Sequence, residues 1–304
     1  MPGFPSYLPA NFTACGSMRR IGAAWIVFAV IAMAAHPRTR KKHIASSFVN
    51  GWYAMTHRTR NRQPHWITPV ATLTPLLEQE YRFDIQRQSS PLLTAWQWGG
   101  GKGLELIPTR STEVIITQPN FFCPGHGFNC SWQSYGGLLK YRLAAAPESA
   151  GNYVVTAFLG ASHALTGGIG QVAPGAGWGK GWGRFDIQQA FSFGFITGLH
   201  SFTLSSPAGN SLLQPPDHQL SLNTALQYHY AARKLWPELE LNAAWLRGGN
   251  QPGMTAYWLT PGIVLGPYRL HKSWGFTFGV GEQFPLSAFP GNVHNLIFTF
   301  RLPF

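Results

Sequence analysis

The 304-residue chain is long enough for one large domain or two ordinary ones, and only 11% of its residues are charged. Soluble domains carry about a quarter charged residues, so this chain is poorly suited to covering a whole surface in water. Its mean hydropathy is -0.06, and its one long apolar run is Ile21–Ala35. A helical membrane protein is therefore excluded, because it needs several apolar runs of about 20 residues.

The net charge of +12 is concentrated near the N-terminus. Arg19 and Arg20 are followed by seven basic residues between positions 36 and 62, whereas all 11 acidic residues lie later in the chain. A nucleic-acid-binding groove needs Lys and Arg clustered within the folded domain. The distribution therefore predicts no nucleic-acid partner.

Residues 18–34 have the form of a secretory signal peptide. Met18-Arg19-Arg20 precedes the apolar run, and Ala32-Met33-Ala34 offers a cleavage site of small residues. A single transmembrane anchor is the alternative, but the run is short for a bilayer helix. Residues 1–17 fit no part of a signal peptide, and we interpret them as an upstream extension from a misassigned start codon.

Residues 35–75 are expected to form a basic periplasmic lead-in that is partly disordered. Apart from a short stretch at Phe48–Met55, residues 36–62 show no pattern. Attraction of the Lys/Arg cluster to a membrane surface is the functional alternative. Trp66–Thr74 could form a strand, but an odd strand number would separate the two termini. We therefore expect this segment in the periplasm or in the barrel lumen.

Residues 76–304 repeat an alternation of apolar and polar residues, which predicts strands. Backbone in lipid must satisfy its own hydrogen bonds, so membrane-spanning strands must close into a barrel. The fold class predicted is an all-β, transmembrane antiparallel barrel of 12 strands, with 10 or 14 as alternatives. The strands expected are 76–87, 103–108, 112–118, 136–146, 151–161, 174–180, 184–196, 219–230, 237–247, 255–266, 273–284 and 293–304.

The connections between these strands alternate in length, as in outer-membrane barrels with short periplasmic turns and long external loops. The long connections are expected near 88–102, 119–134, 162–174, 197–218, 248–254 and 285–292. Tryptophans gather near these ends, with Trp182 and Trp236 at short turns and Trp96, Trp98 and Trp132 at long loops. Two aromatic belts at the membrane interfaces are predicted.

The polar faces of several strands carry full charges of both signs, which suits a hydrated barrel interior. The candidates for lining the lumen are Glu78, Glu80, Arg82, Asp84, Lys140, Arg142, Asp186, Glu238, Glu240 and Arg301. They could border a pathway for solutes. Alternatively, they could form a paired network that fills and stiffens a narrow barrel, since twelve strands lie between filled and open barrels.

Cys123 and Cys130 bracket the sequence CPGHGFNC in a predicted external loop. The third cysteine, Cys15, lies in the predicted upstream extension. The two that remain form an even number in an oxidising compartment, which predicts a disulfide. A metal site that uses His126 with both thiolates is the alternative, but it lacks a fourth ligand and the usual spacing. No metal or cofactor is expected.

The chain ends in His294-Asn295-Leu296-Ile297-Phe298-Thr299-Phe300-Arg301-Leu302-Pro303-Phe304. This segment resembles the terminal strand of Gram-negative outer-membrane proteins. The resemblance implies that the barrel-assembly machinery is a partner and reads an assembly signal made of Phe298, Phe300, Leu302 and Phe304.

Further segments are similar to the transporter / MetA-pathway of phenol degradation family of outer-membrane barrels. They are Arg62–Trp66, Leu77–Glu80, Gly151–Gly160 and Lys180–Gln188. The resemblance covers residues 62–304 and implies an outer-membrane location and passage of small organic compounds. It brings no established site residues.

Together these patterns predict an outer-membrane channel for small solutes, aromatic or other organic ones among them, that contacts outer-membrane lipid. The alternatives are a non-conducting structural or adhesive barrel, a soluble β-sandwich, and a lipid hydrolase. The chain is not expected to be an enzyme, because Ser162 and His163 are adjacent and would point to opposite faces of a strand, and His218 near Ser221 is no better supported.

Overall fold

The computed structural model describes residues 42–304 except 91–93, 126–128, 166–169, 198–201, 207–208, 214–216, 231–233, 249–252, 271–273 and 288–292. The predicted signal peptide at 18–34 and the extension at 1–17 lie outside these residues. The chain divides into two compact units, of which the larger comprises residues 53–202 and 213–304. The smaller contains a separate hairpin of β11 (Phe202–Ser206) and β12 (Gly209–Leu213).

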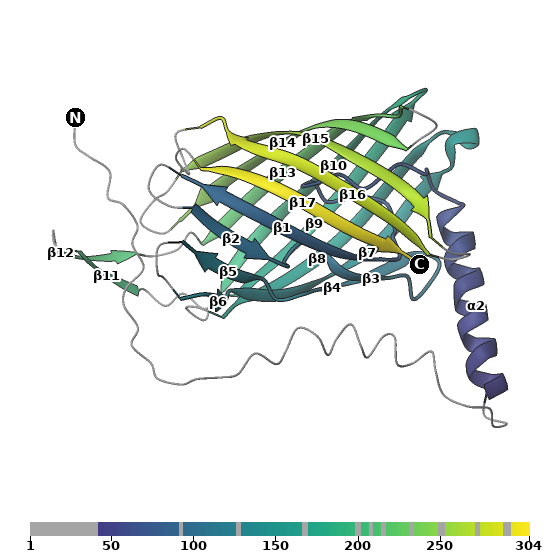
Figure 1. Ribbon diagram of the computed structural model, residues 1–304, viewed down its shortest axis with the longest axis horizontal. Coiled ribbons are helices and arrows are strands. Elements are labelled where there is room, and N and C mark those ends of the chain that lie inside the picture. Colours follow the sequence, from purple (N-terminus) through teal and green to yellow (C-terminus); the bar gives the residue numbers. More distant parts are fainter. Residues whose placement is uncertain are drawn as a thin grey trace. The chain divides into compact units, whose positions relative to one another are not determined.

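The larger unit is a closed antiparallel β-barrel (Figure 1). Its wall strands are β1 (Glu80–Ser89), β3 (Gly103–Leu106), β4 (Thr112–Thr117), β7 (Ser134–Ala146), β8 (Tyr153–Ala164), β9 (Gly170–Trp182), β10 (Phe185–Thr197), β13 (His218–Tyr228), β14 (Leu235–Arg247), β15 (Thr255–Arg269), β16 (Gly275–Pro285) and β17 (His294–Pro303). Pairing of β1 with β17, from Glu80↔Pro303 to Ser89↔His294, closes the ring. The prediction of a 12-stranded antiparallel barrel is confirmed.

Three short strands complete one side of the wall: β2 (Thr94–Trp98), β5 (Phe121–Pro124) and β6 (Ser131–Trp132). They lie in segments 88–102 and 119–134, which we had predicted to be long loops, so this prediction was wrong in part. The strand number does not change, because β2 and β3 pair in turn with the same edge of β1. Between them the chain leaves the wall through Gly99, Gly100 and Gly101, whose φ angles of 76°, 75° and 60° suit glycine.

The connections between the strands distinguish the two ends of the barrel, which are called the turn end and the loop end. The turn end carries the short connections, such as the 3-10 helix η1 (Glu148–Ala150) between β7 and β8 and the tight turn between Trp182 and Phe185. The loop end carries the longer connections. The short connections between β3 and β4, β7 and β8, and β9 and β10 agree with the predicted alternation of short turns and long loops.

A helix precedes the barrel, α2 (Lys42–Arg60), where the sequence had indicated a patternless stretch. Within the short stretch noted above, Phe48, Trp52 and Met55 recur at the spacing of one helical face. Within the residues described, no helix is long and apolar enough to span a membrane.

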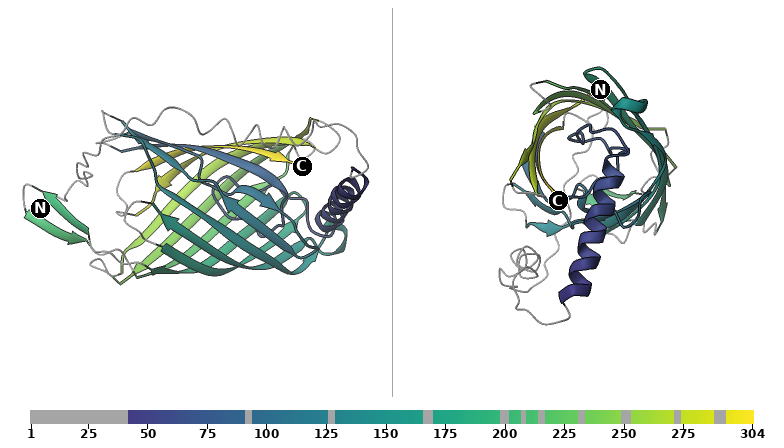
Figure 2. Two further views of the ribbon diagram at one scale, coloured as in Figure 1. Left: turned by 90° about the horizontal axis from the view of Figure 1, so that it is seen from below. Right: turned by 90° about the vertical axis from the view of Figure 1, so that its right-hand side faces the viewer.

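Residues 62–79, here called the inserted segment, lie inside the barrel. The end-on view of Figure 2 shows this part of the chain within the ring of strands. Trp66, Ile67, Val70 and Leu76 form a buried cluster with wall residues. The wall contributes Val154, Trp236, Val264 and Ile297 to this cluster. Trp66–Thr74 was expected either in the periplasm or in the barrel lumen, and in the structure it lies in the lumen.

The strands alternate between an inner and an outer face. In β14, Glu238 and Glu240 are buried whereas Leu239 and Leu241 are 46% and 45% exposed. The other large apolar side chains that stand out from the middle of the wall include Ile116, Leu139, Leu143, Leu159 and Phe191. The inner and outer faces predicted from the alternation are therefore confirmed for these strands.

Aromatic side chains are exposed near both ends of the wall. Trp182, Tyr268 and Trp274 lie at the turn end, and Trp96, Trp98, Trp132 and Tyr135 at the loop end. Trp236 was wrongly assigned to this group, because it is only 1% exposed. Its position two residues before Glu238 puts it on the inner face, where its ring lies 4.1 Å from that of His229.

Candidate functional site

The ten charged residues predicted for the lumen lie inside the barrel, with one difference of placement. Nine of them are at most 7% exposed, and Arg142 is half-buried. Glu78 belongs to the inserted segment and not to a strand, since β1 begins at Glu80. The members on the wall are Glu80, Arg82, Asp84, Lys140, Arg142, Asp186, Glu238, Glu240 and Arg301.

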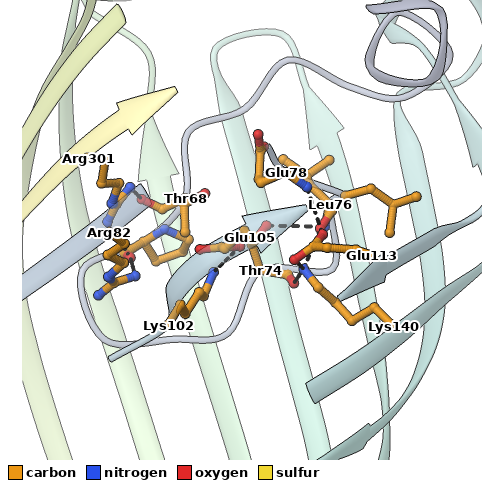
Figure 3. A network of polar contacts seen from close by, with 12 residues as sticks. Thr68, Thr74, Leu76, Glu78, Arg82, Lys102, Glu105, Glu113, Lys140 and Arg301 are labelled. Atoms are coloured by element: carbon orange, nitrogen blue, oxygen red, sulfur yellow. Dashed lines mark hydrogen bonds and ion pairs between the residues drawn. The ribbon is translucent and has the colours of Figure 1, made fainter. Parts of the chain in front are cut away.

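The basic side chains of the wall donate hydrogen bonds to backbone carbonyls of the inserted segment (Figure 3). Arg301 donates to the Thr68 and Pro69 carbonyls. Arg82 donates to the carbonyls of Pro69 and Val70.

Two further wall cations hold the chain on either side of this contact. Lys140 Nζ lies 2.6 Å from the Leu76 carbonyl and 3.3 Å from that of Thr74. Arg142 donates to the Thr59 carbonyl, at 2.9 Å, just before the inserted segment begins. Buried cations thus satisfy carbonyls that have no strand partner.

The acidic side chains of the wall accept the amides of the same segment. Glu238 accepts the N–H of Val70 at 2.9 Å, and Glu240 accepts those of Ala71, at 2.8 Å, and Thr72. Glu113 accepts the N–H of Glu78 at 2.7 Å. Because hydrogen bonds to ionised groups are about twice as strong as neutral ones, these contacts hold the segment firmly in the lumen.

The wall charges also pair with one another. Arg82 Nε lies 2.8 Å from Asp84 Oδ1, and Lys140 Nζ lies 2.9 Å from Glu113 Oε1. His229 Nε2 lies 2.8 Å from Asp186 Oδ2. A buried charge without a partner is costly, so this pairing explains why so many ionisable side chains are tolerated inside.

Several interior polar residues were not identified from the sequence. Glu105 and Glu113 are fully buried, and Lys102 is 8% exposed. Gln188 donates to the Ile67 carbonyl at 2.9 Å and accepts from Thr74 Oγ1 at 2.6 Å. Alternation could have found Glu105, which lies between Leu104 and Leu106, and Gln188, which lies two residues after Asp186 on the same face of β10.

Glycines on the inner face give the inserted segment its space. A Cβ atom at Gly179 would lie 2.5 Å from the Trp66 ring, and one at Gly177 would lie 3.1 Å from Pro75 Cβ. On the other side, a Cβ at Gly279 would meet Val70 Cγ2 at 3.0 Å. The wall is therefore shaped to the side chains of this segment.

Two of the cavities in the described part of the barrel border this segment, one at Ile67 and Thr68 and the other at Val70 and Ala71. The first, of about 130 Å³, is at the turn end and is bordered by Trp66, Thr68, Glu80, Arg301 and Pro303. The second, of about 290 Å³, lies toward the loop end. It is lined by Val70, Ala71, Leu73, Arg82, Asp84, Gln86, Gly101, Lys102, Gln283 and Ile297.

Cys123 and Cys130 form a disulfide in the structure, with their Cα atoms 4.2 Å apart. Cys123 lies in β5, opposite Trp96 of β2, at the loop end. His126 falls outside the described residues. In the part of the chain that the structure describes, no group of three or more His, Cys, Asp or Glu residues could hold a metal ion.

The terminal strand places its predicted signal residues on the outer face. Phe298 and Phe300 lie 6.5 Å and 5.2 Å from the ring of Phe278, and Phe304 lies 5.5 Å from that of Trp274. Leu302 shares this face, whereas Ile297, Thr299 and Arg301 are buried.

Comparison with known proteins gives no family for this chain. No protein-family model matches it, and no curated protein matches its sequence. Its structure is similar to that of the NanC porin, at 7% identity and a TM-score of 0.46, over 73% of this chain and 98% of that one.

Two further solved structures have a similar arrangement. One is an outer membrane channel from Pseudomonas putida F1, at 10% identity and a TM-score of 0.46, over 78% of this chain and 100% of that one. The other is the transport unit of the autotransporter AIDA-I from Escherichia coli, at 10% identity and a TM-score of 0.42, over 84% and 98%. The barrel assignment rests on the strand pairing of the chain itself.

Proposed function

We propose that this protein spans the outer membrane of a Gram-negative bacterium as a channel for small solutes, which the inserted segment closes in the conformation described. The outer face supports the membrane location, because apolar side chains cover its middle and aromatic rings gather at both ends. The strands β7 to β10 have 12 or 13 residues, which exceeds the 9–11 or so needed to cross a bilayer. A β-sandwich is excluded by the closed ring.

The observation that carries the channel proposal is the way the barrel is filled. Its interior holds a separate stretch of chain, and buried side chains of the wall, such as Lys140 and Arg301, hold that stretch by hydrogen bonds to its backbone. Cavities border this stretch at Ile67 and Thr68 and at Val70 and Ala71. Displacement of this one segment would join them into a pathway with a charged lining. Small solutes, aromatic or other organic ones included, are the class that such a narrow pathway would pass.

A reversible disulfide bond between the inserted segment and the wall tests the channel proposal. A Val70→Cys/Gly279→Cys variant joins the segment to β16, because a Cβ at position 279 lies 3.0 Å from Val70 Cγ2. We expect no conductance in planar bilayers while this bond is intact, and rare openings after reduction. The parent protein under the same reductant controls for the native Cys123–Cys130 bond.

A variant that lacks residues 66–75 tests the opposite case, in which the lumen is permanently open. It is expected to conduct continuously, because about ten residues that fill the lumen are gone. A heat-modifiable band on a gel shows that the shortened barrel is folded. A folded deletion variant with no conductance across salts and voltages would overturn the channel proposal.

That outcome would favour the second candidate function, a non-conducting structural or adhesive barrel that acts through its loops. The charge-assisted contacts of Arg82, Lys140, Glu238 and Arg301 with the inserted segment favour it, since they make a filled and rigid interior. The deletion experiment separates the two functions directly.

For assembly, the proposal is that the barrel-assembly machinery reads Phe298, Phe300, Leu302 and Phe304. The Phe304 N–H also donates to the Gln79 carbonyl at 3.2 Å, next to the closing pair of strands. Removal of Phe304 should slow the appearance of the heat-modifiable form in cells. Unchanged assembly in a pulse-chase experiment would argue against this role.

A further inference from the structure

We propose that the cavity toward the loop end is a binding site for a small carboxylate, with Lys102 as its anchoring cation. This inference rests on the channel function proposed above and names a substrate class for it. The cavity has a volume of about 290 Å³, which is enough for an organic anion of a few carbon atoms.

Lys102 Nζ is buried without a hydrogen-bond partner among the described residues. The side chain is 10% exposed, and its only ion pair in the described chain is with Glu105, whose Oε2 is 4.0 Å away. That distance is too long for a hydrogen bond. A buried ammonium has three donors to satisfy, so a ligand oxygen in the cavity that Lys102 lines would supply what the wall does not.

The other charged groups that line the cavity determine which sign of charge, and how many charges, a ligand can carry. Arg82 is occupied by Asp84 and by the Pro69 and Val70 carbonyls. Lys102 is therefore the one lining cation that is short of hydrogen-bond acceptors in the described chain. Asp84 lies on the same lining and would repel a second negative charge. A monoanion such as a carboxylate fits better than a dianion.

The remaining lining suits an organic acid. Gln86 and Gln283 contribute amides, and Val70, Leu73 and Ile297 contribute apolar surface. A ligand with one charged end and a short carbon body finds a partner for each of its parts. Lys102 directly follows Gly99, Gly100 and Gly101, whose positive φ angles interrupt the strand between β2 and β3, and Gly101 lines the cavity beside it.

The test is equilibrium binding of 13C-labelled acetate to the purified, folded barrel in detergent, followed by NMR. Labelled acetamide is the matched probe, because it has the same size and no charge. We expect saturable binding of acetate only, and a loss of about tenfold or more in Lys102→Met, the scale of a charged hydrogen bond. Lys180→Met is the matched control, since Lys180 lies at a distant turn and donates to the Gly151 carbonyl.

Lys102→Met leaves Glu105 without its cation and could misfold. The double variant Lys102→Met/Glu105→Gln restores neutrality, and it too should lose acetate binding while it keeps the heat-modifiable band. Equal binding of acetamide, or acetate binding unchanged in both variants, would overturn the site. Binding needs no conduction, so saturable acetate binding to a barrel whose deletion variant never conducts would refute the channel and leave the site standing.

Discussion

The inner and outer faces of the wall meet two different environments, although they alternate along the same strands. Outside, side chains such as Leu239 and Leu241 are about half exposed and depend on an apolar surrounding. Inside, Glu238 and Glu240 bind individual N–H groups of the inserted segment. The outer face therefore tolerates exchange among apolar residues, whereas the inner face is matched to one particular stretch of chain.

This difference has a physical origin. Contact with lipid is non-directional and scales with apolar area. Charge-assisted hydrogen bonds demand a donor and an acceptor at a fixed distance and angle. Changes on the outer face should affect the stability of the barrel as a whole, and changes on the inner face should first affect how tightly the inserted segment is held.

The largest effect is expected from Trp66→Ala. Trp66 is 4% exposed in the cluster between the segment and the wall, and loss of a buried tryptophan costs about 3–5 kcal/mol. Exchange of the Val70, Ala71 and Thr72 amides with deuterium should become at least about 100-fold faster. Trp182→Ala, on the outer face, should leave the exchange rate of these amides unchanged. Equal effects of the two substitutions would show that the faces are not distinct.

Leu239→Arg tests the outer face. An arginine in the middle of a lipid-facing wall costs about 2–4 kcal/mol of folding free energy, against about 0–1 near an interface. Leu270→Arg, at the turn after β15, is the control. The measurement is urea unfolding of the barrel in lipid vesicles. A similar cost at both positions would contradict a lipid-facing middle.

Gly179→Ala tests the fit of the segment to the wall. The added methyl group would lie 2.5 Å from the Trp66 ring, and overpacking of this kind costs about 1–3 kcal/mol. Amide exchange in residues 70–72 should become about tenfold faster. Gly160→Ala is the matched control, because its nearest neighbour would be 3.6 Å away. The proposed fit fails if the two variants exchange alike.

The smallest effect on the barrel is expected from Cys123→Ser/Cys130→Ser. In the chain-entropy model, closing a loop of this size is worth about 2.5 kcal/mol, mostly in local order. The heat-modifiable band should therefore persist. Mass spectrometry of the parent under non-reducing conditions should show no free thiol at Cys123 or Cys130, and finding both free would refute the disulfide.

Much of the wall could be predicted from the sequence, because an alternation with a period of two reports directly which face a residue occupies. Leu139 and Lys140, or Phe300 and Arg301, lie on the sides that this period indicates. The prediction was wrong at Trp236 because it followed the expected aromatic belt, whereas the period of two places Trp236 on the inner face with Glu238. Segments 88–102 and 119–134 were misjudged because β2, β5 and β6 have only two to five residues, too few for a pattern.

The inserted segment could not be predicted in the same way. Its backbone groups pair with side chains far away in the sequence, such as Val70 with Glu238 and Thr68 with Arg301, so it shows no helical or strand period. The sequence by itself determined a closed barrel with charged residues inside and apolar residues outside, since local alternation carries that information. Only the tertiary structure decided that those charges hold a second stretch of chain, because contacts such as that between Glu238 and Val70, 168 residues apart, leave no local signal.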